Sequence, residues 1–215
     1  MAIFESFLLG NVTKSVSNLT MYIAKGVNVV RGKPLKIHNP RTNKQKTQRA
    51  KMKALMELVP DFIPVLPYGY PKTAGFVRAQ NCFVQDNMAA VTVDDMSFEA
   101  TVNFEQLVCS SGHLKAPVVS LSIDAASRSM TFTQSIQQPM LTVDPTDVAW
   151  VVGYEKALGE VALYELGNRA TGGEFPFELP EDWDVEQCVF YLFARNVAGT
   201  DVSRTVYLEA EITGV

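Results

Sequence analysis

Apolar and polar residues alternate with a period of two along most of the chain after Met88. The alternation runs through the segments AAVTVDD, SFEATVNFEQLV, APVVSLSID, RSMTFTQ, VAWVVGY, EVALYEL, EFPFELP, CVFYLFARN and RTVYLEAEI. Turn-type residues separate many of them, as at Ala126-Ser127-Arg128, Leu158-Gly159, Gly172-Gly173 and Ala198-Gly199. Short strands at such spacing are typical of an antiparallel β-sandwich. We therefore expect residues 88–215 to form one.

Within CVFYLFARN, the alternation puts Phe190 and Leu192 on one face of a strand and Tyr191 and Phe193 on the other. One of these pairs is then either exposed or buried under helices from the N-terminal part of the chain. We favour burial, because such packing would tie the two parts of the chain together.

The first part of the chain predicts a β-hairpin. Residues 19–24 and 27–31 are rich in strand-forming residues, and Lys25-Gly26 lies between them as a turn. Asn39 and Pro40 then end the extended segment.

A helix is predicted next, because Thr42 and Gln45 have the spacing of a capping box. Its expected apolar stripe recurs at helical spacing and consists of Met52, Leu55, Met56 and Val59. We expect Pro60 to end this helix.

An irregular stretch should follow, because Pro64, Pro67 and Pro71 each remove a backbone donor. Thr73 can cap a second helix that ends near Asp86-Asn87. The face expected to pack on the first helix consists of Phe76, Val77, Gln80, Phe83 and Val84. The predicted fold is thus mainly β with a small α part (α+β): a basic hairpin and helix pair in residues 1–87, then the sandwich in residues 88–215.

Charge is distributed unevenly along the chain. The net charge is −4, but residues 1–60 hold 11 of the 19 Lys and Arg and 2 of the 23 Asp and Glu. They therefore carry 11 − 2 = +9, and the remainder carries 8 − 21 = −13. A basic segment of this kind can bind a polyanion or dock on an acidic protein surface. The candidate contact residues are Arg31, Lys33, Arg41, Lys44, Lys46, Arg49 and Lys53.

The NPRTNKQKTQR segment around Arg41 can be interpreted in two ways. The positive end of a helix beside several cations could hold phosphate. Alternatively, Asn39 and Thr42 cap the helix while Arg41 and Arg49 bind backbone carbonyls or acidic side chains, and capping chemistry explains most of these residue types. Nucleic-acid binding is less favoured, since the isoelectric point is about 5.3 and no aromatic residues alternate with the basic ones.

Candidate catalytic chemistry is sparse. Cys109, Ser110, Ser111 and His113 are close in sequence, but Cys109 and His113 would lie about 13 Å apart on an extended chain. The acidic pairs Asp94-Asp95, Asp144 with Asp147, and Glu181-Asp182 match no calcium loop. Phosphate-binding glycine loops and Cys/His metal clusters are also missing from the sequence. We expect no enzymatic activity, no cofactor and no metal, and the sequence leaves any small-molecule substrate unknown.

A third class of function is carbohydrate binding, which would need exposed aromatic rings that are coplanar. The candidate rings are Trp150, Tyr154, Tyr164, Trp183, Phe190, Tyr191, Phe193 and Tyr207. Strand alternation assigns most of them to the core.

The expected location is the cytoplasm. The N-terminal segment MAIFESFLLGNV has no leading Lys or Arg and is interrupted by Glu5, which is unlike a secretory signal. No apolar run approaches the roughly 20 residues of a membrane helix. Three widely spaced cysteines fit reduced thiols better than a disulfide framework.

Two resemblances add to this interpretation. From about Pro117 onward the strand pattern resembles a fibronectin type III or immunoglobulin-like sandwich, with Gln134 where that family has a buried tryptophan and Trp150 or Trp183 as its substitute. The whole chain resembles an uncharacterised bacterial family known only as a domain of unknown function. Its signature NPRT…Q..QR matches Asn39 to Arg49, and SSGHL and ELPEDW match later landmarks.

The resemblance implies no reaction, ligand or catalytic residue. The leading prediction is a non-catalytic structural or protein-interaction module whose partner is another protein or a second copy. The alternatives are a polyanion-binding protein that uses residues 25–53 and a carbohydrate-binding sandwich.

Overall fold

The computed structural model describes residues 2–4, 10, 12–34, 39–71 and 78–213. Contacts divide the chain into two compact units, Met1–Thr42 and Asn43–Val215. The sequence placed its domain boundary between residues 87 and 88 instead. The helices fall in the second unit because they share a buried core with the strands that follow them.

The first unit is a four-stranded antiparallel sheet of order β1-β4-β3-β2. Its strands are β1 (Ala2–Phe4), β2 (Lys14–Val16), β3 (Leu19–Ala24) and β4 (Val27–Gly32). The predicted hairpin is confirmed as β3 and β4. Lys25 and Gly26 both have positive φ, 51° and 80°, as a tight two-residue hairpin turn requires.

Helix α1 (Asn43–Phe62) opens the second unit, and α2 (Leu66–Gly69) and α3 (Ala79–Asn87) follow. The prediction that the first helix ends at Pro60 is wrong, because α1 continues to Phe62 with Pro60 inside it. Phe62 is fully buried and its ring stacks on Phe83 at 5.2 Å between centroids. That packing holds the last turn in place despite the proline.

The predicted apolar stripe of α1 is only half right. Met52 and Met56 are 45% and 50% exposed, whereas Leu55 and Val59 are buried together with Phe62. The buried stripe is therefore rotated from the predicted one, toward the side on which α3 and the strands lie.

The end of α3 at Asn87 agrees with the prediction, and Phe83 and Val84 are buried as expected. The predicted cap Thr73 and the face residues Phe76 and Val77 lie outside the described residues. Helix α2 was not predicted, because its proline pointed to an irregular segment. Among the described helices, none is both long enough and apolar enough to cross a bilayer.

The remaining strands confirm a mainly β fold. One sheet has the order β10-β9-β12-β13 and is antiparallel throughout; the other has the order β11-β8-β7-β14, in which only β14 and β7 run parallel. Their bounds are β7 (Val119–Asp124), β8 (Ser129–Gln134), β9 (Val148–Glu155), β10 (Glu160–Asn168), β11 (Gly173–Glu178), β12 (Cys188–Arg195), β13 (Val206–Leu208) and β14 (Ala210–Thr213). A small antiparallel hairpin, β5 (Val91–Val93) and β6 (Ala100–Val102), precedes them, with the short 3₁₀ helices Phe104–Gln106 and Val185–Gln187 between elements.

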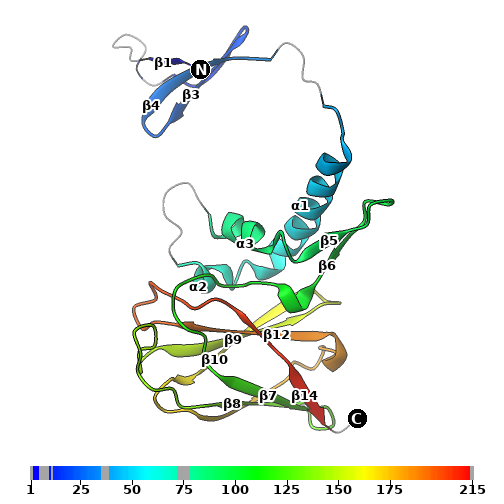
Figure 1. The fold of residues 1–215 in the computed structure, drawn as a ribbon, viewed down its shortest axis with the longest axis vertical. Helices are drawn as coiled ribbons and strands as arrows, with labels where there is room; N and C mark the ends of the chain where they lie inside the picture. Colours follow the sequence, from blue (N-terminus) through cyan, green and yellow to red (C-terminus); the bar gives the residue numbers. More distant parts are fainter. Residues whose placement is uncertain (1, 5–9, 11, 35–38, 72–77, 214–215) are drawn as a thin grey trace. The chain divides into compact units, whose positions relative to one another are not determined.

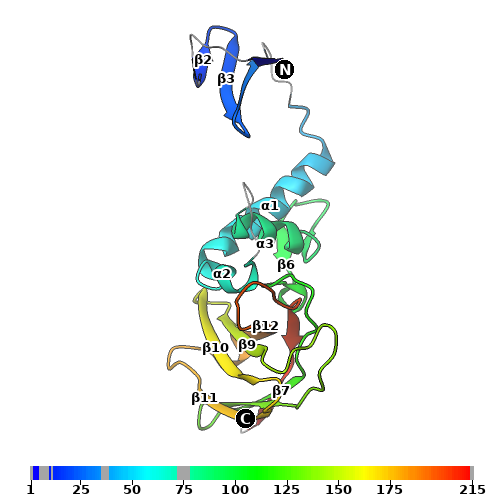
Figure 2. The same cartoon turned by 90° about the vertical axis from the view of Figure 1, so that its left-hand side faces the viewer.

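The sheet β10-β9-β12-β13 is covered on both sides. The two large sheets pack face to face over one apolar core, and the helices cover the opposite side of β9 and β12 over a second core (Figures 1 and 2). Strand β12 serves both: Phe190 and Leu192 lie in the core between the sheets, and Tyr191 and Phe193 lie under the helices. The predicted burial of the second pair is confirmed.

The two tryptophans lie in different layers. Trp183 is 3% exposed within the core between the sheets, whereas Trp150 packs partly buried on the helical side. Trp183 therefore contributes to the core between the sheets, and Trp150 does not. Gln134 is also buried, and its Nε2 donates to the Asn168 carbonyl at 3.1 Å.

Candidate functional site

The predicted basic segment is divided between the two units. Arg31, Lys33 and Arg41 belong to the first unit, and the other four candidates lie on α1. All seven candidates are exposed. Three of the seven candidates therefore belong to one compact unit and four to the other.

Several of these cations already have neighbours. Arg31 lies over the Tyr22 ring at 5.8 Å, and Lys46 lies over the Phe98 ring at 4.8 Å. Lys53 pairs with Glu57 one turn later at 3.8 Å. Helix α1 begins directly after Thr42, the position predicted for its cap.

The CSSGHL segment is partly buried. Cys109 and Ser110 are fully buried, whereas His113 is exposed. The Ser110 hydroxyl donates to the Ser203 carbonyl at 2.9 Å and lies 2.9 Å from the Thr205 hydroxyl. Burial raises the pKa of the Cys109 thiol well above its ordinary value, so it is protonated and unreactive at neutral pH.

The acidic candidates mostly cap turns. The Asp94 carboxylate accepts from the Met96 and Ser97 amides, and the Asp144 carboxylate accepts from Thr146. These hydrogen bonds lower the pKa of both carboxyls. Within the described ranges, no group of three or more His, Cys, Asp or Glu is placed to hold a metal ion.

The aromatic candidates are covered. Tyr154, Trp183, Phe190, Tyr191 and Phe193 are buried, and Trp150, Tyr164 and Tyr207 are half-buried. None of these eight rings therefore belongs to an exposed stacking platform. The carbohydrate alternative requires exposed, coplanar aromatic rings, and these eight rings do not provide them.

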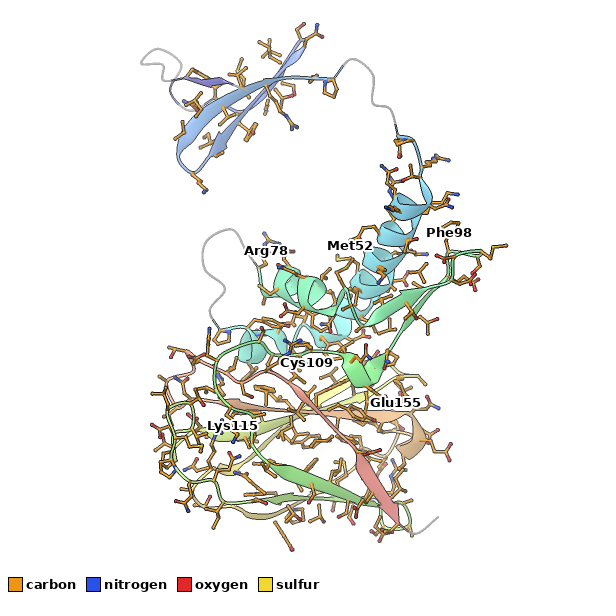
Figure 3. All side chains as sticks on the ribbon, in the orientation of Figure 1. Met52, Arg78, Phe98, Cys109, Lys115 and Glu155 are labelled. Carbon is orange, nitrogen blue, oxygen red and sulfur yellow. The ribbon has the colours of Figure 1, made fainter. Side chains whose placement is uncertain are left out.

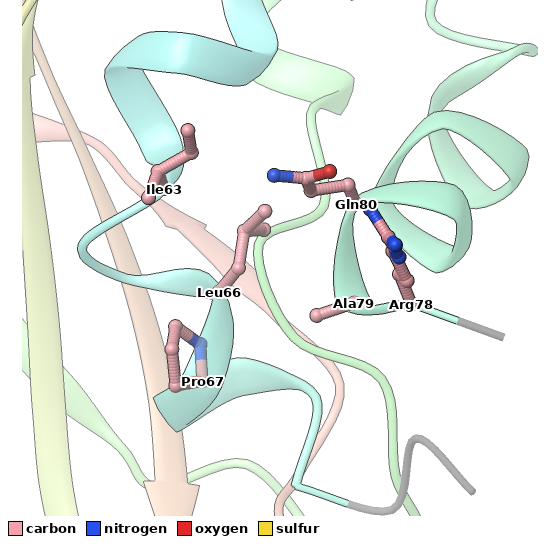
Figure 4. Close-up of a pocket in the computed structure, with 6 residues that line it drawn as sticks. All are labelled: Ile63, Leu66, Pro67, Arg78, Ala79 and Gln80. Atoms are coloured by element: carbon pink, nitrogen blue, oxygen red, sulfur yellow. The ribbon is translucent and has the colours of Figure 1, made fainter. Parts of the chain in front are cut away.

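A small concave site lies where α1 ends and α3 begins (Figure 4). Its volume is about 240 Å³, and its lining consists of Ile63, Leu66, Pro67, Arg78, Ala79 and Gln80. Arg78 is the one charged residue among these six. A site of this volume is smaller than a typical cofactor pocket.

A more distinctive arrangement surrounds Arg169, which follows β10. Its side chain is 0% exposed and pairs with the equally buried Asp147, with 3.3 Å between Nε and the carboxylate. The guanidinium also donates to the Gln137 side chain at 2.9 Å and to the Lys115 carbonyl. One buried arginine thus joins three segments that are far apart in the sequence.

We call this arrangement of Arg169 with Asp147, Gln137 and Lys115 the Arg169 clamp. Backbone hydrogen bonds strengthen it. The Arg169 amide donates to the Asp147 carbonyl at 3.0 Å, and the Gln137 amide donates to the Arg169 carbonyl at 3.1 Å. Burial raises the pKa of the Asp147 carboxyl, although the Asp144 amide and the Arg169 guanidinium both act to lower it. The clamp fixes the connection between β8 and β9.

The clamped connection contains a segment that we call the uncharged loop, residues 135–143 with the sequence SIQQPMLTV. It ends in a tight turn in which Met140 and Val143 exchange both backbone hydrogen bonds at 3.1 Å. Leu141 at the turn is 103% exposed, and Met140 and Ile136 are 64% and 63% exposed. A hydrogen-bonded turn therefore presents large apolar side chains to solvent.

Val118 extends this surface from the segment before β7. It is 56% exposed, and its carbonyl accepts from the Ser135 amide at 3.0 Å. The surface lies at the end of the sandwich where β9 begins, whereas Glu155 marks the end where β9 finishes. Figure 3 labels one residue near each end. Lys115 lies beside the uncharged loop, and Glu155 lies at the other end of β9.

Residues 11–209 match the model of a protein family described as Family of unknown function (DUF6266). The chain belongs to this family. A search of curated proteins found no match. The predicted resemblance to a family of unknown function is thereby confirmed, while the NPRT…Q..QR signature and the bacterial origin stay predictions.

The DUF6266 match covers residues of both units and includes the Arg169 clamp and the uncharged loop. Sequence reasoning missed both features. Arg169 follows a strand and looks like an ordinary surface residue. The available signal was a run of fifteen residues without Asp, Glu, Lys or Arg, residues 129–143, which ends in the loop.

Proposed function

We propose that this DUF6266 protein is a non-catalytic protein-interaction module whose sandwich presents the uncharged loop to a partner. The observation that carries the proposal is the combination of rigid anchoring and apolar exposure in one loop. Preorganised loops bind with less loss of conformational entropy, and apolar side chains at their tips supply the contact energy.

We also propose that the sandwich is of the fibronectin type III or immunoglobulin-like kind. Counted from β7, the strands of one sheet follow the order fifth, second, first, eighth, with the eighth parallel to the first, and those of the other follow fourth, third, sixth, seventh. The constant-type immunoglobulin sandwich places its first, second, fourth and fifth strands on one sheet and its third, sixth and seventh on the other. Six of these seven positions agree here; the fourth strand, β10, lies on the other sheet, and β14 is an additional strand. The connection between the second and third strands, which carries partner-binding residues in antibody domains, corresponds here to residues 135–147.

Site-specific crosslinking in the source cell tests the interaction. A benzophenone amino acid replaces Leu141 in one variant and Leu158 in a matched control, since Leu158 is 52% exposed in the β9–β10 hairpin at the other end of β9. Light should give a discrete protein adduct from position 141 that is missing from position 158. Equal adducts from both positions, or none from either, would refute the proposal.

Polyanion binding is a second candidate, supported by the exposure of Lys44, Lys46, Arg49 and Lys53 on one helix. Phosphate-driven binding is strongest at low salt. We expect retention on heparin at about 50 mM salt if this candidate is right, and loss of retention when Lys44 and Lys46 are both replaced by Gln. A protein that passes through the column at this salt concentration excludes it.

A further inference from the structure

We infer that the partner of the uncharged loop is a second copy of this chain, bound around a two-fold axis through Leu141. The inference rests on the proposed function, since it uses the same surface. It adds the identity of the partner and the symmetry of the contact.

Charge on the surrounding surface limits which partners can approach. From Ile63 to Val215 the chain has 8 Lys and Arg against 20 Asp and Glu, so this part carries 8 − 20 = −12. An anionic membrane or nucleic acid would be repelled by that field. The exposed apolar side chains of the loop fit a protein surface whose core is apolar.

Two segments of the surface are free of charge altogether. Residues 116–123 and the uncharged loop contain no Asp, Glu, Lys or Arg. Val118 and the loop are neighbours through the hydrogen bond between Ser135 and Val118. Two identical acidic bodies can meet across such a surface without placing like charges at its centre, and depletion of charge is typical of the centre of protein interfaces.

The rim of the surface is self-complementary. Lys115 and Asp144 are both exposed and carry opposite charges. The Lys115 amide donates to the Thr142 carbonyl at 3.1 Å, while Asp144 lies two residues after Thr142, so the two charges flank the same turn. In a two-fold contact every contact between two different residues occurs twice, so Lys115 of each copy can face Asp144 of the other.

The shape of the turn suits this arrangement. Leu141 projects fully into solvent from a two-residue turn whose backbone is closed by hydrogen bonds at both ends. Near a two-fold axis, Leu141 would pack against its own symmetry mate and against Met140 and Ile136. The Arg169 clamp and the hydrogen bonds of the turn hold the backbone that carries these exposed side chains.

Sedimentation equilibrium of the full chain over a wide concentration range tests the inference. The wild-type mass should rise from 23.7 kDa toward twice that value as concentration increases. Leu141→Lys should weaken dimerisation at least about tenfold, because it puts two like charges at the centre of the contact. Leu158→Lys adds the same charge at the far end of β9 and should leave the dimerisation constant unchanged.

Leu141 is fully exposed, so its replacement should leave the circular dichroism spectrum and the thermal midpoint unchanged, which separates lost association from lost folding. A wild-type protein that stays monomeric at all concentrations would overturn the inference, as would a dimer that Leu141→Lys and Leu158→Lys weaken equally. If crosslinks from position 141 join a different protein, the second-copy inference fails while the proposed function stands.

Discussion

The sheet of residues 1–42 and the sheet β10-β9-β12-β13 are both four-stranded, antiparallel and rich in apolar residues, yet they bury those residues to different extents. In the first sheet Val29 is buried at 5% exposure, while Leu19, Ile23 and Val27 are 37–43% exposed. In the second sheet, β12 has six consecutive buried residues, from Val189 to Ala194. Strand pattern alone therefore does not decide burial.

The difference arises from what covers each sheet. The sheet β10-β9-β12-β13 has a second sheet on one side and the helices on the other, so side chains of both orientations are covered. The first unit comprises 42 residues, and a chain of that size rarely covers both faces of a sheet without help. We therefore expect the two units to differ in how much each residue contributes to stability.

The largest expected effect comes from the Arg169 clamp. Arg169→Met leaves the buried Asp147 carboxylate without its cation, and breaking a buried ion pair in this way typically costs about 3–5 kcal/mol. We expect urea unfolding of the second unit to show a loss of this size. The transition of the first unit should not move.

Two further variants test the physical reason for that loss. Replacing both partners, Arg169→Met with Asp147→Leu, should be less destabilising than Arg169→Met alone, because no unpaired charge is then left buried. Arg204→Met removes an exposed arginine and should change stability by less than about 0.5 kcal/mol. If Arg204→Met is as damaging as Arg169→Met, the clamp does not stabilise the protein in the way we describe.

A matched pair of substitutions compares the two sheets directly. Val151 in β9 is 0% exposed between the two large sheets, and Val29 is the buried valine of the first sheet. Val151→Ala should cost about 2 kcal/mol, because it removes buried methyl groups and leaves a cavity in a closed core. Val29→Ala should cost less than about 1 kcal/mol, because the neighbouring side chains are free to move into the space. Equal losses in denaturant titrations would show that the first sheet has a closed core after all.

Much of the fold could be predicted from the sequence, because alternation and turn residues are local signals. The β3–β4 hairpin, the strands after Met88 and the two-sided burial of β12 were all predicted correctly. The errors arose where tertiary contacts outweighed local preference. Pro60 is held inside α1 by the packing of Phe62, and Met52 is exposed because the covering elements lie on another side of the helix.

The candidate site was harder to predict than the fold. The groups that Arg169 contacts lie 22 to 54 positions away in the chain, and no local sequence pattern predicts such contacts. The seven basic candidates were chosen from charge density, which does not reveal that they are divided between two units. A charge-free run was visible in the sequence, but only the turn geometry showed that its apolar side chains point into solvent.

The smallest expected effect concerns the thiols, which all lie in the second unit and so report on that unit alone. Burial, with the nearby Glu155 and Asp184 carboxylates, raises the pKa of Cys188 to about 12. At pH 8 roughly one in 10⁴ of the Cys188 side chains is then ionised, so alkylation by iodoacetamide should be much slower than for a free thiol with its pKa near 8.5. Its rate should rise about tenfold for each pH unit while the fold is intact, because the thiolate fraction rises by that factor.

Val151→Ala should accelerate this labelling more than Val29→Ala does, as measured by peptide mass spectrometry, because only the former opens the core beside β12. Fast labelling of Cys188 in the wild type at pH 8 would show that the β12 end of the sandwich opens far more readily than its packing indicates.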